Sequence, residues 1–148
     1  MSNWRVWRAS IEDQETLVQL ERHAFGARSW GADAVKASFD AAGVSVLFGG
    51  RADDIPSGFV MWRDLGEEAE LLTIGVSPAS RGAGLGAAML QSVLAAARKG
   101  GAHKIYLEVD RQNPAALRLY QKAGFANVGQ RKAYYRDGGD ASVMACGL

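Results

Sequence analysis

The chain has 148 residues and a mass of 15.8 kDa, enough for one domain that buries roughly 70% of the surface its unfolded form would expose. Hydrophobic residues make up 48% and charged residues 22% of it, which excludes a disordered chain, a collagen-like chain and a coiled-coil rod. The formal net charge is only +1, so no overall field favours nucleic acid or an anionic membrane as a partner.

The first half of the chain is predicted to contain one strand, two helices and then three strands. Bulky and charged residues alternate over residues 4–8 and indicate a strand, after which Ser10 and Asp13 favour a helix start. Apolar residues at helical spacing predict helices over residues 11–25 and about 30–41. Short apolar segments separated by Gly, Asp and Pro then predict an antiparallel meander, with strands at residues 44–48, 58–62 and 69–76.

The middle of the chain has the order strand, glycine-rich segment, helix and strand. The amphipathic helix is expected to begin at Leu85 and to stop before Gly100. Residues 104–109 alternate between two faces and predict a strand, which a right-handed crossover would place parallel to the strand at 69–76.

A fourth helix and two strands are predicted to end the chain. Asn113 can cap this helix with Pro114 at its first position, and Gly124 is a typical stop. The last two strands are expected near residues 125–130 and 141–146. The sequence therefore predicts one α/β domain over residues 1–148, with a mixed sheet that is antiparallel early and parallel in the middle.

Cysteine and histidine usage indicates no disulfide and no metal site. Cys146 is the single cysteine, and the chain shows no apolar run long enough for a membrane span and no signal-peptide pattern, so we expect a cytoplasmic protein. His23 and His103 lack the spacing of metal ligands. We expect Cys146 to be a small buried hydrophobic residue.

The segment Arg-Gly-Ala-Gly-Leu-Gly at residues 81–86, called the glycine loop below, lies at a predicted helix start. Unpaired N–H groups and the helix dipole attract an anion there. The glycine spacing differs from the dinucleotide fingerprint, and the absence of Gly-Lys-Ser/Thr excludes a nucleotide P-loop. Another kind of pyrophosphate cradle remains, or a turn that is glycine-rich for tight geometry alone.

Four motifs stand at fixed separations in the second half of the chain. They are LTIGVSP at residues 72–78, RxxGxG at 81–86, LEV at 107–109 and NxxAxxLYxxxGF at 113–125. A tail with RxxYY at 131–135 and DAxxM at 140–144 follows. Together they resemble the GCN5-related N-acetyltransferase family, and within it the bacterial ribosomal-protein alanine N-acetyltransferases (RimI-like).

The resemblance implies the acyl-CoA N-acyltransferase fold, a mixed and mostly antiparallel sheet whose central parallel strands splay apart around acetyl-CoA. It implies no metal. The backbone at residues 74–76 would pair with the pantetheine arm, and residues 81–87 would wrap the pyrophosphate. Many relatives have a second basic or glutamine side chain beside Arg81, where this chain has Ser80 and Gly82, so more of the binding must come from the main chain. The implied cofactor-binding residues are Ile74, Gly75, Val76, Arg81, Gly82, Ala83, Gly84, Leu85, Gly86, Ala87 and Asn113.

Acetyl transfer to an amine requires a neutral nucleophile, a polarised carbonyl and a proton for the leaving thiolate. Glu108 is expected on the face opposite Leu107 and Val109, and the resemblance implies that it is the general base; a solvated strand carboxylate is the alternative. Tyr120 is implied as the general acid, or else it is a core aromatic. A phenol with a pKa of about 10 can protonate a thiolate whose conjugate acid has a pKa of about 8.5.

An N-terminal α-amine is the favoured acceptor. Its pKa is about 8 against about 10.4 for lysine, so at neutral pH its free base is roughly several hundred times more abundant. The subgroup resemblance points to the N-terminal alanine of a small-subunit ribosomal protein, bound in a groove between Phe25 and Trp30 on one side and Tyr134 and Tyr135 on the other. Each of these aromatics can instead be a packing residue.

Two other functions remain open at the sequence level. The protein could acetylate a small amine such as a polyamine, an aminoglycoside or an amino acid, and a deep acidic acceptor pocket would favour that function. It could also be a non-catalytic acyl-CoA-binding module. We expect a monomer or weak dimer whose partner is a peptide or protein N-terminus, with neither nucleic acid nor membrane bound.

Overall fold

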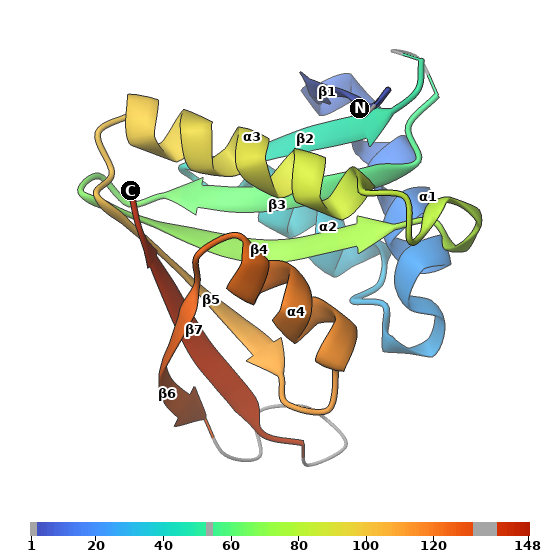
Figure 1. Ribbon diagram of the computed structural model, residues 1–148. Coiled ribbons are helices and arrows are strands. Elements are labelled where there is room, and N and C mark those ends of the chain that lie inside the picture. Colours follow the sequence, from blue (N-terminus) through green and yellow to red (C-terminus); the bar gives the residue numbers. More distant parts are fainter. Residues whose placement is uncertain (1–2, 53–54, 132–138) are drawn as a thin grey trace.

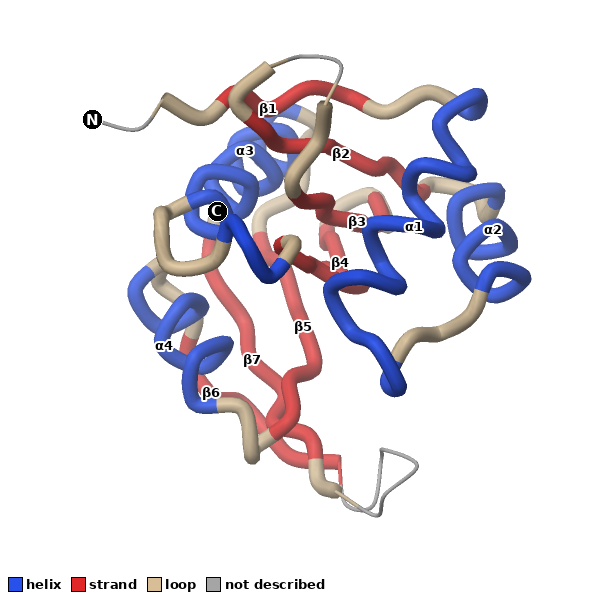
Figure 2. Tube along the Cα trace, turned by 90° about the vertical axis from the view of Figure 1, so that its right-hand side faces the viewer, coloured by secondary structure: helices blue, strands red, loops and turns tan. Residues whose placement is uncertain are grey.

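The computed structural model describes residues 3–52, 55–131 and 139–148, which form a seven-stranded sheet with helices on both faces (Figures 1 and 2). Helices α3 and α4 cover one face, and α1 and α2 cover the other. Along the chain the elements are β1 (Arg5–Arg8), η1 (Ile11–Asp13), α1 (Gln14–Phe25), η2 (Gly26–Arg28), α2 (Ala32–Asp40), β2 (Val44–Gly50), β3 (Gly58–Asp64), β4 (Glu68–Val76), η3 (Pro78–Ser80), α3 (Leu85–Lys99), β5 (Lys104–Asp110), α4 (Pro114–Lys122), β6 (Ala126–Arg131) and β7 (Ala141–Gly147).

The strand order across the sheet is β1-β2-β3-β4-β5-β7-β6. All neighbouring strands are antiparallel except β4 and β5, which are parallel and are joined by the crossover helix α3. The predicted meander, the parallel pair and the α/β class are therefore confirmed. The last strand, β7, inserts between β5 and β6, an order that the sequence analysis left open.

Strands β4 and β5 share only a short ladder. Their pairing runs over three residue pairs, from Glu68 opposite Lys104 to Glu70 opposite Tyr106. Beyond these pairs the two strands diverge toward their carboxyl ends (Figure 1). The strands thus splay as expected, and the space between them, called the opening below, lies where parallel strands commonly bind ligands.

A β-bulge in β4 gives this divergence a physical cause. Met61 pairs with Thr73 while the next residue, Trp62, pairs with Leu71, so Leu72 is an extra residue on β4. A bulge bends its strand and increases the local twist. It occurs two residues after the β4–β5 ladder ends, where the bend carries β4 away from β5.

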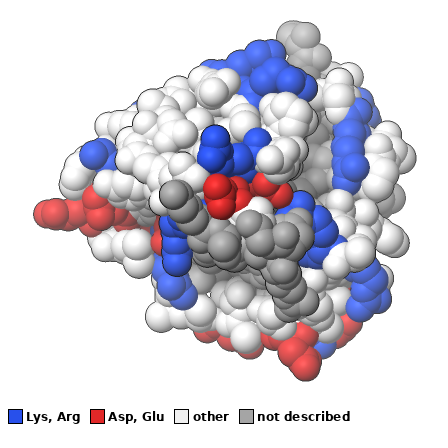
Figure 3. Space-filling model, turned by 90° about the horizontal axis from the view of Figure 1, so that it is seen from below, with Lys and Arg blue, Asp and Glu red and all other residues white. Residues whose placement is uncertain are grey.

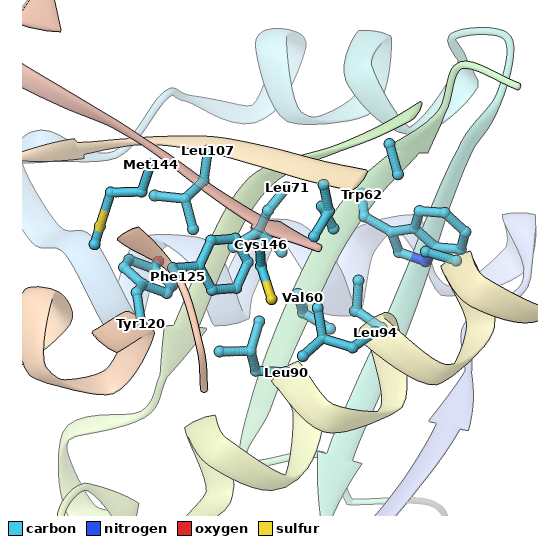
Figure 4. Close-up of a cluster of buried hydrophobic side chains, with 14 of the residues drawn as sticks. Val60, Trp62, Leu71, Leu90, Leu94, Leu107, Tyr120, Phe125, Met144 and Cys146 are labelled. Carbon is cyan, nitrogen blue, oxygen red and sulfur yellow. The ribbon is translucent and has the colours of Figure 1, made fainter. Parts of the chain in front are cut away.

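Two hydrophobic cores lie on the two faces of the sheet. The core under α3 and α4 spans both sides of the opening (Figure 4) and includes Val60, Trp62, Leu71, Leu90, Leu94, Leu107, Tyr120, Phe125, Met144 and Cys146. The core under α1 and α2 is built on β2 and β3, with Leu17, Val18, Leu20, Val35, Val46, Phe48, Phe59 and Met61. Helix α3 buries the apolar stripe that predicted it, so its 3.6-residue periodicity is explained by packing on the sheet.

Two helix starts differ from the sequence prediction. The helix expected from residue 11 opens with the 3-10 turn η1, where the Asp13 carboxylate accepts a 2.8 Å hydrogen bond from the backbone N–H of Ser10. The helix expected from about residue 30 begins at Ala32, because Gly31 adopts a φ of 90° that cannot continue a helix. In the described ranges, no helix combines the length and the apolar character needed to cross a membrane.

Candidate active site

The glycine loop presents a row of backbone donors at the start of α3. Gly82 and Gly84 have φ values of 77° and 89°, a region that glycine tolerates without strain. The first helical bond joins the Ala88 N–H to the Gly84 carbonyl at 3.1 Å, so the N–H groups of Leu85, Gly86 and Ala87 have no acceptor inside the helix. A Cβ built on Gly82 or Gly84 meets nothing within 4 Å, so the loop faces open space. Such an arrangement can bind an anion.

The side chain of Arg81 has structural partners. Its Nη2 donates to the Ala24 carbonyl at 2.7 Å, and its Nε donates to the Val76 carbonyl at 3.1 Å. These bonds connect the last turn of α1 to the end of β4. The donors that the glycine loop offers to an anion therefore belong mainly to the main chain.

The end of β4 forms one wall of the opening. Ile74 and Val76 pack against the core under α3, whereas Gly75 faces α1. A Cβ at Gly75 would lie 2.7 Å from Phe59 Cε1 and 2.9 Å from the Ala24 Cβ. Glycine at this position is thus explained by the close packing of α1.

Strand β5 forms the other wall and carries two carboxylates on its α1-side face, opposite the core-facing residues of the strand. Glu108 Oε1 lies 2.7 Å from Arg131 Nη1, and the Glu108 side chain is 28% exposed. Asp110 Oδ2 lies 3.0 Å from Arg28 Nη1, and its side chain is 11% exposed. Seen from below the view of Figure 1, acidic side chains form a patch among basic side chains (Figure 3).

Tyr120 lies across the sheet from Glu108. It is buried in the core under α3, where its ring centre is 5.8 Å from that of Phe125 (Figure 4). The structure thus places the two predicted catalytic residues on opposite faces of the sheet, Glu108 on β5 and Tyr120 on α4. Asn113 caps the helix that carries Tyr120, because its Oδ1 accepts a 3.1 Å hydrogen bond from the Ala116 N–H, and the predicted N-cap is confirmed.

The connection between α1 and α2 borders the opening on the α1 side. The Glu21 carboxylate, only 2% exposed, accepts hydrogen bonds from the Ser29 hydroxyl and from the Trp30 N–H, the latter at 2.7 Å. The Trp30 side chain is 42% exposed on this braced connection. Phe25 packs edge-on against Phe59, at 6.2 Å between ring centres, as a core-facing residue.

The predicted acceptor residues Tyr134 and Tyr135 lie outside the described residues. A cavity of about 350 Å³ lies beside Trp30, between α2 and the sheet, and is lined by Trp30, Ala37, Ser38, Ala41, Arg63 and Leu72. Among residues 3–52, 55–131 and 139–148, no three His, Cys, Asp or Glu side chains are grouped to hold a metal ion.

Sequence reasoning missed the roles of three charged residues near the opening. Asp110 and Arg28 form an ion pair, and Glu21 holds the connection between α1 and α2 through hydrogen bonds. Asp110 could have been found, since it follows Glu108 by two residues and a strand places such residues on one face. The partner Arg28 is 82 positions away from Asp110, and no local pattern indicates that contact.

The sequence and the fold were compared with known proteins. A protein of Mycobacterium tuberculosis named N-alpha-acetyltransferase RimI is 49% identical over 78 residues, which cover 52% of this chain and 48% of that protein. The chain thus spans about half the length of the curated relatives it matches.

Solved structures match over almost the whole chain. The ribosomal-protein-S18-alanine N-acetyltransferase from Escherichia coli superposes with a TM-score of 0.89 at 26% identity, covering 98% of this chain and 94% of that chain. YncA from Salmonella typhimurium, solved with its cofactor acetyl-CoA, has a TM-score of 0.81 at 24% identity, covers 99% of this chain and 95% of that chain, and supports the fold. The family profile described as "Acetyltransferase (GNAT) family" matches residues 8–125, and the chain belongs to this family.

Proposed function

We propose that this protein transfers the acetyl group of acetyl-CoA to the α-amine of an N-terminal alanine, with a small-subunit ribosomal protein as acceptor. One observation carries the proposal: the β4–β5 opening has the glycine loop on the α3 side and Glu108 on the α1 side. The relatives named for alanine and N-α acetylation support the choice of acceptor.

The residues present fit acetyl-CoA. The free N–H groups at the start of α3 and the open space around Gly82 and Gly84 suit a pyrophosphate. The exposed backbone edge of β4 beyond Glu70, which no longer pairs with β5, suits the amides of a pantetheine arm. When bound, the cofactor supplies the thioester carbonyl that the amine attacks.

Glu108 and Tyr120 divide the proton transfers between them. The Glu108 carboxylate takes a proton from the acceptor ammonium, directly or through a water, which leaves the neutral nitrogen free to attack the carbonyl carbon. A C–N bond forms and the C–S bond breaks. The Tyr120 phenol would give its proton to the departing sulfur, and the second proton of the attacking nitrogen, released as the amide forms, would restore the phenol. The backbone N–H near Val76 would donate to the carbonyl oxygen as charge develops there.

The acceptor side favours a peptide over a small polycation. Glu108 and Asp110 each have an arginine partner, so these two carboxylates do not form the deep acidic pocket that a polyamine or an aminoglycoside would require. The exposed Trp30 beside the opening offers an apolar contact to a polypeptide instead.

A peptide panel tests this function directly. Peptides with Ala, Ser, Met and Lys-bearing termini are incubated with protein and acetyl-CoA and analysed by tandem mass spectrometry, with spermidine as a small-amine competitor. We expect an acetyl group on the α-amine of the Ala peptide and none on the same peptide with a blocked N-terminus. Transfer to lysine side chains or to spermidine alone would contradict the assignment.

A further inference from the structure

Trp4 connects the amino-terminal segment to the glycine loop. It lies just before β1, and its indole Nε1 donates a 2.8 Å hydrogen bond to the carbonyl of Ala83, 79 positions along the chain. The guanidinium carbon of Arg51 lies 4.0 Å from the centre of the Trp4 ring, a cation–π contact that fixes the plane of the indole.

This bond sets the direction of a peptide unit in the loop. No peptide bond in the described chain is cis, and a trans peptide unit is planar with its C=O and N–H pointing in opposite directions. Because the Ala83 carbonyl points at the indole, the Gly84 N–H points away from it. A rotated peptide unit would instead turn a carbonyl oxygen toward the space that the Gly84 N–H now faces, and a carbonyl repels an anion.

The loop has few other means of fixing this orientation. Ala83 stands between Gly82 and Gly84, both at positive φ with nothing within 4 Å of an added Cβ. Glycine has the widest choice of backbone angles, so the Ala83–Gly84 peptide unit can rotate at little cost unless a partner fixes it. The side chain of Arg81 is engaged with the Ala24 and Val76 carbonyls.

We propose that Trp4 is a positioning residue of the cofactor site: its indole N–H fixes the Ala83–Gly84 peptide unit so that the Gly84 N–H donates to a phosphate oxygen of acetyl-CoA. The inference rests on the proposed function. Trp4 acts on the phosphates through the main chain and does not touch the reacting atoms. Its effect is therefore confined to acetyl donors that contain the pyrophosphate.

The test removes the indole N–H. Trp4→Phe keeps an aromatic ring beside Arg51 and removes the donor. Trp7→Phe is the matched control: Trp7 lies in β1, its ring packs edge-on against Phe48 at 6.3 Å, and it belongs to the core under α1. Binding of CoA and of pantetheine, which lacks the pyrophosphate, is measured by calorimetry for both variants and the wild type. Steady-state kinetics then compare acetyl-CoA with S-acetylpantetheine as donor.

We expect Trp4→Phe to raise the Kd for CoA and the KM for acetyl-CoA by about three- to tenfold, the usual effect of one lost hydrogen bond. Its kcat and its kcat/KM for S-acetylpantetheine should match the wild type, as should every parameter of Trp7→Phe. Unchanged CoA binding, or equal losses with CoA and pantetheine, would overturn the inference. If the wild type binds CoA but acetylates no α-amine, the proposed function fails while the binding comparison still decides the role of Trp4.

Discussion

Each carboxylate at the end of β5 has an arginine partner from a distant part of the chain. Glu108 pairs with Arg131 at the end of β6, and Asp110 pairs with Arg28 between the first two helices. In the proposed reaction, an acceptor ammonium would take the place of the Arg131 guanidinium beside Glu108, with the same charge. Asp110 is less exposed and also accepts a 2.8 Å hydrogen bond from the Gln112 N–H, so it stabilises the turn after β5.

Replacing Glu108 by Gln should separate catalysis from binding. The amide keeps the size of the side chain but cannot accept the ammonium proton, so kcat should fall by about 100-fold or more while the Kd for CoA stays unchanged. Glu70→Gln, a carboxylate change on the neighbouring β4, is the control and should leave both values unaltered. A turnover equal to the wild type would refute the role of Glu108, and no turnover in the wild type itself would favour the acyl-CoA-binding module.

Helix α1 is tied to the connection that leads into α2 by the buried carboxylate of Glu21. Burial of a charge is costly unless hydrogen bonds compensate for it, and Glu21 accepts two, both from the connection to α2. This connection presents Trp30 to solvent. The buried carboxylate therefore helps to order this connection, together with the Arg28–Asp110 ion pair.

Glu21→Met tests this bracing. Methionine fills a similar volume but offers no carboxylate, so the Trp30 N–H loses its acceptor and the free energy of unfolding in urea should fall by about 1–3 kcal/mol. The KM for the acceptor peptide should rise, since Trp30 is no longer fixed. Glu21→Gln can keep both bonds, with its oxygen facing the Trp30 N–H and its amide facing the Ser29 hydroxyl, and should resemble the wild type. Equal behaviour of the two variants would show that volume, and not hydrogen bonding, orders the connection.

Local periodicity predicted most of the helices and strands, because these depend on spacings of two or 3.6 residues, and the order strand, helix, strand predicted the parallel pair. The starts of the first two helices were the exceptions. Long-range contacts were not predictable in the same way. The insertion of β7 beside β5 depends on cross-strand packing, and the bulge at Leu72 depends on the register with β3. At the site, the glycine-rich helix start predicts an anion-binding loop, which stays a prediction, whereas the contact of the Trp4 indole with this loop joins residues 79 positions apart and has no local sequence signal.

At the scale of the whole molecule, the sheet has two antiparallel parts that are joined by the short β4–β5 ladder. Strands β1 to β4 form one part, and β5, β7 and β6 form the other. Seven residue pairs join β5 to β7, but only three join β4 to β5. The core under α3 and α4 contains residues of both parts of the sheet (Figure 4). Packing in this core, more than the short ladder, keeps the two walls of the opening at a fixed separation.

The thiol of Cys146 allows the burial of this core to be tested by the pH dependence of stability. It is buried on β7, where its Sγ contacts the Ala123 carbonyl, and burial raises the pKa of the thiol, an effect that Arg98 partly opposes. Because the raised pKa favours the neutral thiol in the folded state, its contribution to stability is complete below the unfolded pKa of about 8.5 and is lost as the pH rises through the folded pKa. Urea unfolding of the wild type and of Cys146→Ala should therefore differ by a constant amount at pH 6–8, and above pH 8 the wild type should lose stability relative to the variant. If the difference in unfolding free energy between the two proteins stays constant up to pH 10, the thiolate is as well solvated in the folded protein as in the unfolded chain.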